Sequence, residues 1–265
     1  MTDSFKQTAW LAWTLSKRQY QQSFKGSFLG PLLPFMYNLA MLSLYSLVFS
    51  VILQVKWQQA GVSGNATDIP FWLVLFSGQV MYFCLSENLA KAPTLVLAVP
   101  NYVKKIIFPL HILPFINLSV SLFTLAINLL LLLAATIFFV GFNPAFMYIP
   151  FLILQLCCWS LGAGWLLGAL GVFIRDLQQL VPVIAQVLFF ATPIVYPLSA
   201  VPEKFRFILY LNPLTNIVET LRGLLFFNQN PDFLVFGGWT VLSILFAFAS
   251  FFVFQKMRPS FADVM

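Results

Sequence analysis

The stretch between Arg175 and Arg222 decides how the rest of the chain is interpreted. It begins with RD at 175–176, continues through the uncharged residues 177–200, and then runs VPEKFR at 201–206, LNPLT at 211–215, Glu219 and Arg222. The first part has the length and polarity of a membrane span. The second part is apolar but is interrupted by Pro or a charge every few residues. It is therefore predicted to form an irregular hairpin at the membrane surface that does not cross the bilayer.

Composition places the whole chain in a membrane. Of the 265 residues, 60% are hydrophobic and 8% are charged, and the mean hydropathy is +0.90, whereas soluble domains are about 25% charged. The three cysteines lie in apolar runs without a CxxC motif, which argues against a disulfide framework or a zinc site. The first long apolar run starts near Leu29 and is too long for a cleaved signal, so the N-terminus is expected to stay attached. The predicted class is an all-α integral membrane protein without a soluble catalytic domain.

Uncharged apolar runs predict six transmembrane helices, since about 20 residues cross the hydrocarbon core. These spans are placed at about 29–55, 69–86, 112–140, 145–174, 177–196 and 233–255. They form a transmembrane domain over residues 29–257, followed by a cytoplasmic tail at 258–265. Residues 1–28 are too polar to span. Trp10, Trp13 and Tyr20 fall on one side of a helical wheel, opposite Arg18 and Lys25, which predicts a cytoplasmic amphipathic helix at the interface.

The positions of Lys and Arg predict the orientation. Ten of these residues flank one side of the predicted spans and four flank the other. Both termini are therefore expected in the cytoplasm, and the hairpin after the fifth span on the outer side. Residues 87–109, with breaks at Pro93, Pro100 and Pro109, are predicted to form a cytoplasmic loop with a short helix at residues 94–99.

Catalytic chemistry has few candidate residues. His111 is the single histidine and the eight carboxylates are scattered, so no nucleophile–base–acid set and no metal site is predicted. The sequence has no G-x-x-x-x-G-K-[ST] motif, so the chain is not expected to hydrolyse nucleotide itself. Clustered intramembrane carboxylates, which ion-coupled transporters use, are also missing from the sequence. An enzyme is not expected.

Two spacings predict packing contacts. Glu219 and Arg222 are three residues apart, so on a helix they share a face and pair. That pair either holds the shape of the hairpin or forms a gating contact. Gly164 and Gly168 form a G-x-x-x-G pattern in an apolar helix, which favours close helix packing either within one subunit or between two.

Aromatic residues make up 17% of the chain and are the main candidates for binding a substrate. Aromatic faces attract the C–H edges of sugars without a fixed hydrogen-bond pattern, so a chain of repeating sugar units can slide along them. The aromatics that we expect to line such a path lie on the first and fifth predicted spans. They are Tyr37, Tyr45, Phe49, Phe189, Phe190 and Tyr196. Most other aromatics are expected to face lipid or neighbouring helices.

Motifs spread over nearly the whole chain carry a family resemblance. They are RD at 175–176, TPIVYP at 192–197, VPEKFR at 201–206, LYLNPLT at 209–215, VKKIIFP at 103–109 and FADVM at 261–265. Together they resemble the ABC-2 type permeases that export lipid-linked polysaccharides, above all the O-antigen exporters. The resemblance implies a homodimer of six-span subunits in the cytoplasmic (inner) membrane. Each subunit would be bound by a separate ATPase subunit that holds ATP and Mg²⁺, with no cofactor on the permease itself.

The resemblance also implies a substrate and roles for particular residues. A polymer on an undecaprenyl diphosphate carrier would pass between the two permeases, and nucleic acid is not a partner. The coupling helix that docks in the ATPase would include Lys91, Thr94, Leu95, Pro100, Asn101 and Tyr102. Two short re-entrant outer helices, at 198–205 and 215–227, would close the outer mouth with Glu203, Arg206, Tyr210, Glu219 and Arg222. The residues that meet lipid headgroups or the carrier diphosphate, or that only set the topology, are Arg18, Lys25, Lys104, Lys105 and Arg175.

Several other functions are compatible with the same sequence. An ABC-2 exporter of capsular polysaccharide, of teichoic acid or of a small hydrophobic compound has the same general features. A membrane scaffold in envelope assembly would bind no ATPase. A membrane glycosyltransferase is disfavoured because the sequence shows no clustered carboxylate site.

Overall fold

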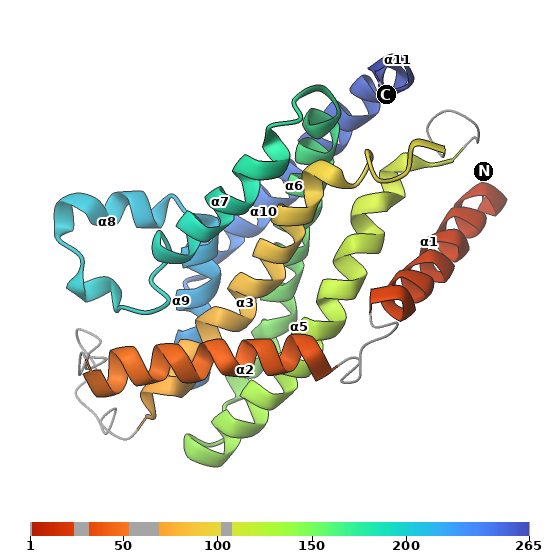
Figure 1. Cartoon of the computed structure of the whole chain (residues 1–265). Helices are drawn as coiled ribbons and strands as arrows, with labels where there is room; N and C mark the ends of the chain where they lie inside the picture. The colour runs from red at the N-terminus through yellow and green to blue at the C-terminus, as the bar shows by residue number, and fades with distance from the viewer. Residues whose placement is uncertain (1, 24–31, 53–68, 102–107, 265) are drawn as a thin grey trace.

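The computed structural model of the chain describes residues 2–23, 32–52, 69–101 and 108–264, and the regular elements in these ranges are all helical (Figure 1). The longer helices are α1 (Thr2–Ser23), α2 (Leu32–Ser46), α3 (Phe71–Lys91), α5 (Leu113–Phe139), α6 (Ile149–Phe173), α7 (Leu177–Phe190), α9 (Pro213–Phe226) and α10 (Phe233–Met257). The short ones are η1 (Leu47–Ile52), η3 (Ala92–Thr94), η4 (Leu110–Ile112), η5 (Pro144–Tyr148), η6 (Leu198–Ala200), α8 (Glu203–Tyr210), η7 (Arg258–Ser260) and α11 (Phe261–Val264). The predicted all-α class is confirmed.

Four of the described helical segments are long and apolar enough to cross a membrane. They are Phe71–Thr94, Leu110–Phe139, Pro144–Phe173 and Phe233–Val264, which correspond to the second, third, fourth and sixth predicted spans. Helix α7 has 14 residues and is about 21 Å long at roughly 1.5 Å per residue. It is shorter than predicted because the helix ends before Pro193. Helix α2 and the π-helical η1 occupy residues 32–52 of the first predicted span, so the count of six spans stays a prediction.

Helix α6 lies at the centre of the bundle, packed along α10 and against α3, α5 and η3 (Figure 1). Two of its glycines permit this close approach. A Cβ atom on Gly164 would lie 2.9 Å from Cβ of Pro114 on α5, and one on Gly171 would lie 2.2 Å from the carbonyl oxygen of Pro93 in η3. The small residues of α6 therefore serve packing within the subunit, which was one of the two expected alternatives.

The hairpin after α7 differs from the prediction in its first helix and in the position of its second. Residues 198–205, expected to be one helix, form η6 and then, from Glu203, the exposed helix α8. Helix α9 starts two residues before the predicted position and packs in the core against α3 and α6. Its apolar side chains recur three and four residues apart on one face, and that face is buried. Asn143, in the turn between α5 and η5, donates to the carbonyl oxygen of Leu224 at 2.8 Å and so anchors the end of α9.

The opposite end of the bundle gathers the elements expected on the cytoplasmic side. Val96, Phe108, Trp165, Phe254 and Phe261 form one buried apolar cluster there, which we call the end cluster. Arg258 donates to the carbonyl oxygen of Phe108 at 3.1 Å, so the chain after α10 is tied to the segment that precedes α5. The turn after α3 and the C-terminal helix α11 therefore share a common packing layer.

Helix α1 packs beside α5, with its last turns against the middle of that helix (Figure 1). Tyr20 contacts Phe123 with ring centroids 4.5 Å apart, and Leu15 packs on the end cluster. Trp10 and Trp13 point away from the protein and are exposed. Of the predicted aromatic face, Tyr20 therefore packs on the bundle, whereas Trp10 and Trp13 do not. The assignment of residues 1–28 to the membrane interface stays a prediction.

Candidate functional site

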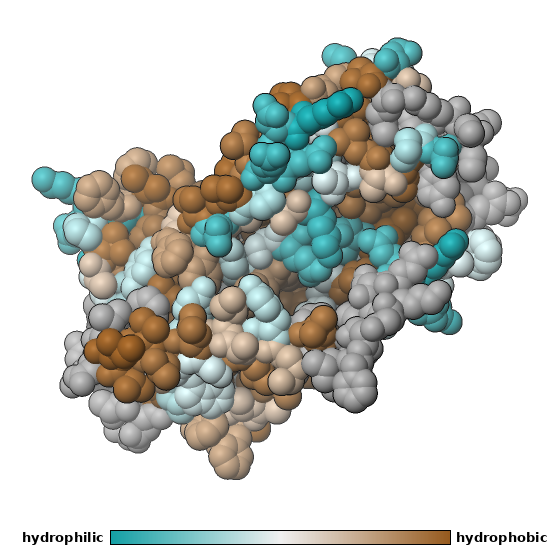
Figure 2. All heavy atoms as spheres, in the orientation of Figure 1, coloured by the Kyte–Doolittle hydropathy of each residue, from teal (hydrophilic) through white to brown (hydrophobic). Residues whose placement is uncertain are grey.

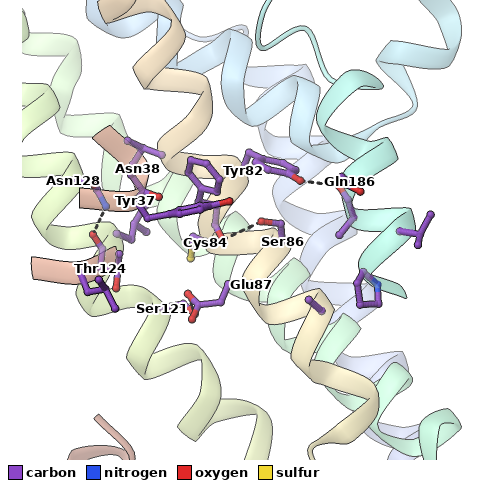
Figure 3. Close-up of a pocket in the computed structure, with 18 residues that line it drawn as sticks. Tyr37, Asn38, Tyr82, Cys84, Ser86, Glu87, Ser121, Thr124, Asn128 and Gln186 are labelled. Atoms are coloured by element: carbon purple, nitrogen blue, oxygen red, sulfur yellow. Dashed lines mark hydrogen bonds between the residues drawn. The ribbon is translucent and has the colours of Figure 1, made fainter. Parts of the chain in front are cut away.

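A cavity of about 760 Å³ opens between α2, α3, α5 and α7 (Figure 3). Each of these helices contributes at least one polar side chain to it, among them Asn38 from α2 and Gln186 from α7. In Figure 2, hydrophilic side chains gather in the middle of this face, over α3 and the adjoining part of α5, between more hydrophobic flanking surfaces. A polar, concave site inside a membrane bundle is the default place to look for a substrate.

One wall of the cavity is aromatic. The rings of Tyr37 on α2 and Phe83 on α3 meet edge to face with their centroids 6.0 Å apart. Tyr82 donates a 2.9 Å hydrogen bond to the carbonyl oxygen of Ala185, which joins α3 to α7. Behind it, Phe189 packs against Tyr82 at 4.9 Å and stacks on Tyr45 at 5.1 Å. This wall is rigid because each ring is held by another ring or by a backbone carbonyl.

The other wall is a row of polar side chains. Ser121, Thr124 and Asn128 lie three and four residues apart on α5 and therefore share one face of that helix. Ser121 donates to Oε2 of Glu87 on α3 at 2.9 Å, and Lys91 reaches Oε1 of the same carboxylate at 2.6 Å. Asn128 donates to the carbonyl oxygen of Thr124 at 2.9 Å. The ribbon of α3 and the stick side chains in Figure 3 show Glu87 pointing toward Ser121.

This polar wall was not predicted: the second predicted span ended at residue 86, which left Glu87 in a loop, and the third was treated as uniformly apolar. Helix α3 continues to Lys91, so Glu87 is helical and not part of a loop. Lys91 is four residues further on and neutralises the charge, which makes the extra turn compatible with a membrane edge. Asn88 and Asn117 are buried and joined by a 2.9 Å hydrogen bond in the same region. Polar residues at helical spacing in the otherwise apolar third span were the signal available in the sequence.

The structure separates the six aromatics that were predicted to line a path. Tyr37 lines the cavity, whereas Tyr45 and Phe189 support its aromatic wall from behind. Phe190 is exposed on the outside of α7, and Tyr196 donates to its carbonyl oxygen at 2.6 Å. The side chain of Phe49 lies outside the part of the chain that the structure describes.

The predicted coupling segment is partly described. Lys91 ends α3, and Thr94 Oγ1 donates to its carbonyl oxygen at 2.8 Å. Leu95 packs on the end cluster, while Pro100 and Asn101 are exposed at the start of the next helix. Tyr102, Lys104 and Lys105 lie outside the described residues, as does Lys25. Of the basic residues expected to meet lipid or diphosphate, Arg18 and Arg175 are described and both are exposed.

The residues predicted for the outer hairpin form two separate clusters. On α8, Arg206 lies 4.0 Å from Glu203 and donates to the carbonyl oxygen of Val201 at 2.8 Å, and Tyr210 is exposed. On α9, Glu219 and Arg222 form the expected pair at 2.9 Å.

Arg222 is the largest of the fully buried side chains, with 1% of its surface exposed. Beyond Glu219, its guanidinium donates to three backbone carbonyl oxygens. They belong to Pro193, to Ile194 at 2.9 Å and to Val74 at 3.3 Å. Arg222 thus ties α9 to α3 and to the turn that ends α7. This geometry supports the structural one of the two expected roles.

A helical bundle with membrane-length apolar helices around an amphipathic cavity is typical of a multi-pass membrane protein. The sequence profile of the ABC-2 type transporter family matches residues 11–226, so the chain belongs to that family. The match runs from α1 to the end of α9 and includes all four helices that line the cavity.

Three curated relatives extend the similarity over nearly the whole chain. The O-antigen export system permease protein RfbA of Myxococcus xanthus is 24% identical over 254 residues, which cover 94% of this chain and 93% of the relative. Two proteins of the same name from Klebsiella pneumoniae are 22% and 21% identical, and each alignment covers 95% of this chain and 93% of the relative. The chain is therefore similar to O-antigen export permeases along its full membrane domain.

Proposed function

We propose that this chain is the permease subunit of an ABC exporter for a polysaccharide of the O-antigen type, carried on undecaprenyl diphosphate across the cytoplasmic (inner) membrane. The observation that carries the proposal is the cavity between α2, α3, α5 and α7, with Tyr37 and Phe83 on one side and Ser121, Thr124 and Asn128 on the other. A sugar ring presents apolar C–H faces and hydroxyl edges. The two walls offer one partner for each kind of surface.

The names of the relatives support the same substrate class. All three are called O-antigen export permeases and align over more than nine-tenths of this chain. A small hydrophobic compound would use the aromatic wall but would form no hydrogen bonds with the polar side chains of the other wall, which is unfavourable inside a membrane. The capsular and teichoic-acid exporters share the sugar chemistry and differ in the repeat unit.

The proposed energy source is a separate ATPase subunit that binds ATP and Mg²⁺. The segment after α3 is the proposed docking element, because Pro100 and Asn101 are exposed next to the end cluster. The preceding turn η3 packs directly on α6. A displacement of the docking segment by the ATPase would therefore move α6 at the centre of the bundle. In this arrangement both termini lie in the cytoplasm and two copies of the chain form the channel. The exposed Arg18 and Arg175 are then placed to meet lipid headgroups.

Deletion of the gene in its host tests the proposed function directly. We expect lipid-linked polymer to accumulate inside the cell and to disappear from the surface, as measured by gel analysis of envelope polysaccharide and by cell fractionation. A plasmid copy of the wild-type gene should restore the surface polymer. Normal surface glycan in the deletion strain would contradict polysaccharide export and favour a small-molecule exporter.

Replacement of Tyr37 by Ala tests the aromatic wall. We expect roughly threefold to tenfold less surface glycan at normal protein level, because a favourable aromatic contact is worth about 0.5–1.5 kcal/mol. The matched control is Phe138→Ala at the far end of α5, where the ring is 82% exposed and does not line the cavity. Equal surface glycan in the two variants would remove Tyr37 from the substrate path.

A further inference from the structure

We infer that the polar row of the cavity is a binding site for an uncharged sugar residue of the exported polymer, and that it discriminates against the diphosphate of the carrier. The row consists of Ser121, Thr124 and Asn128 on α5, together with Glu87 of α3, which accepts a hydrogen bond from Ser121 (Figure 3). This inference rests on the proposed function and assigns one part of the substrate to one site. Three features of the cavity support it: the hydrogen-bonding capacity of the row, the charge of the row, and the aromatic wall that faces it.

Ser121 and Asn128 present hydrogen-bond acceptors, since the donors of both side chains are already engaged. The Ser121 hydroxyl donates to Glu87 and keeps only its lone pairs for a ligand. Asn128 uses its amide nitrogen on the carbonyl oxygen of Thr124. Its Oδ1 atom has no hydrogen-bond partner among the described residues, although only 2% of the residue surface is exposed. Ser121 and Glu87 add acceptor atoms to the lining of the cavity, so the site is matched to a ligand rich in hydroxyl groups.

The charge of the row excludes an anion and does not call for a cation. Glu87 is compensated by Lys91 at 2.6 Å, so the carboxylate needs no second positive partner. Lys91 is not among the residues that line the cavity, whereas Glu87 is. The negative end of this ion pair therefore faces the ligand. A diphosphate brings more negative charge and only acceptor oxygens, and both properties are mismatched to this surface.

The facing wall supplies the remaining contacts that a sugar ring needs. Tyr37 and Phe83 stand across the cavity from the α5 row and offer aromatic surface to the apolar face of a pyranose. The volume of about 760 Å³ lies within the range that holds a drug-sized ligand. An acceptor-rich edge opposite an aromatic face selects a neutral polyol over a lipid chain, a phosphate or an ammonium group.

The test compares three ligands that share one tail and differ in the head group. The purified full-length protein, held in amphipol, is titrated by calorimetry with octyl β-glucoside, octyl phosphate and octylammonium, each below its critical micelle concentration. Protein-free amphipol gives the blank. The variants are Glu87→Gln, Ser121→Ala and Asn128→Leu. The matched control is Glu203→Gln on α8, where the carboxylate side chain is 91% exposed and does not line the cavity.

We expect the wild-type protein to bind the glucoside more tightly than the phosphate or the ammonium compound. Glu87→Gln and Asn128→Leu should each weaken glucoside binding by about fivefold to tenfold, the effect of one strong hydrogen bond. Glu203→Gln should leave it unchanged. If Glu87→Gln fails to fold, as judged by thermal unfolding, Ser121→Ala provides the same comparison. The inference is overturned if octyl phosphate binds best and Glu87→Gln tightens it, or if the cavity variants bind the glucoside like the control.

The failure of this inference is distinguishable from failure of the proposed function. Loss of surface glycan in the deletion strain, together with unaltered glucoside binding in the cavity variants, would leave polysaccharide export intact and remove the assigned site. Normal surface glycan in the deletion strain would overturn the proposed function, whatever the titrations show.

Discussion

Replacement of Arg222 by Met is expected to lower the free energy of unfolding by about 3–5 kcal/mol, the usual range for breaking a buried ionic contact. The change removes the donor for the carbonyl oxygens of Pro193, Ile194 and Val74. No water reaches these oxygens, because the guanidinium that fills the site is fully buried. The loss of stability is measured by heating the protein in detergent and monitoring the folded fraction by size-exclusion chromatography. Arg222→Lys should also lower the free energy of unfolding, since an ammonium group cannot reproduce the planar arrangement of donors in a guanidinium.

The control for this experiment is Arg206→Met on α8. Arg206 also pairs with a carboxylate three residues away, but at 4.0 Å and at the surface. Such pairs contribute less than about 1 kcal/mol. If the Arg222 and Arg206 variants unfolded at the same temperature, the buried network would have no special role in holding α9.

Replacement of Gly171 by Val is expected to reduce surface glycan at least tenfold while much of the protein still inserts. Even the first carbon of a side chain would lie 2.2 Å from the carbonyl oxygen of Pro93, a backbone atom that cannot rotate away. The turn η3 therefore has to separate from α6, and the proposed path from the ATPase into the bundle is interrupted. Overpacking of this kind destabilises a protein by about 1–3 kcal/mol. Surface glycan at matched protein level is the measurement.

Gly237→Ala on α10 is the matched control. A Cβ atom there meets nothing within 4 Å, and the residue is helical. Alanine is favoured over glycine in a helix by up to about 1 kcal/mol, so this variant should be as active as the wild type and no less stable. Full export by the Gly171 variant would show that η3 and α6 need not stay in contact.

The sequence predicts the long uncharged helices well because their only requirement is length and apolarity. Helices α5 and α6 lie within one or two residues of the prediction at most ends, and Gly141 and Asn143 fall in the gap between the two predicted spans. The pairing of Glu219 with Arg222 also follows from their spacing alone. Local rules suffice for these features.

The same rules did not predict the positions of the charged residues that lie inside the bundle. Glu87 was taken as the end of a span and Arg222 as a sign of the surface, because a lone charge is unfavourable in lipid. The structure satisfies the first through Lys91 and Ser121, and the second through Glu219 and backbone carbonyls. Most of these partners are distant in sequence or are backbone atoms, which a single sequence does not reveal. The separation of Tyr37 from Phe190 likewise depends on helix rotation, which the even apolarity of these helices hides.

The backbone carbonyl oxygens that accept hydrogen bonds from Arg222 also have a consequence for the order of membrane insertion during synthesis. Val74, Pro193 and Ile194 all precede Arg222 in the chain, so its acceptors have left the ribosome before it does. An arginine that enters hydrocarbon alone costs about 2.5–3.5 kcal/mol on translocon scales. That cost is offset only once α3 and the end of α7 have met. Helix α9 is therefore expected to pack only after α3 and the end of α7 have met.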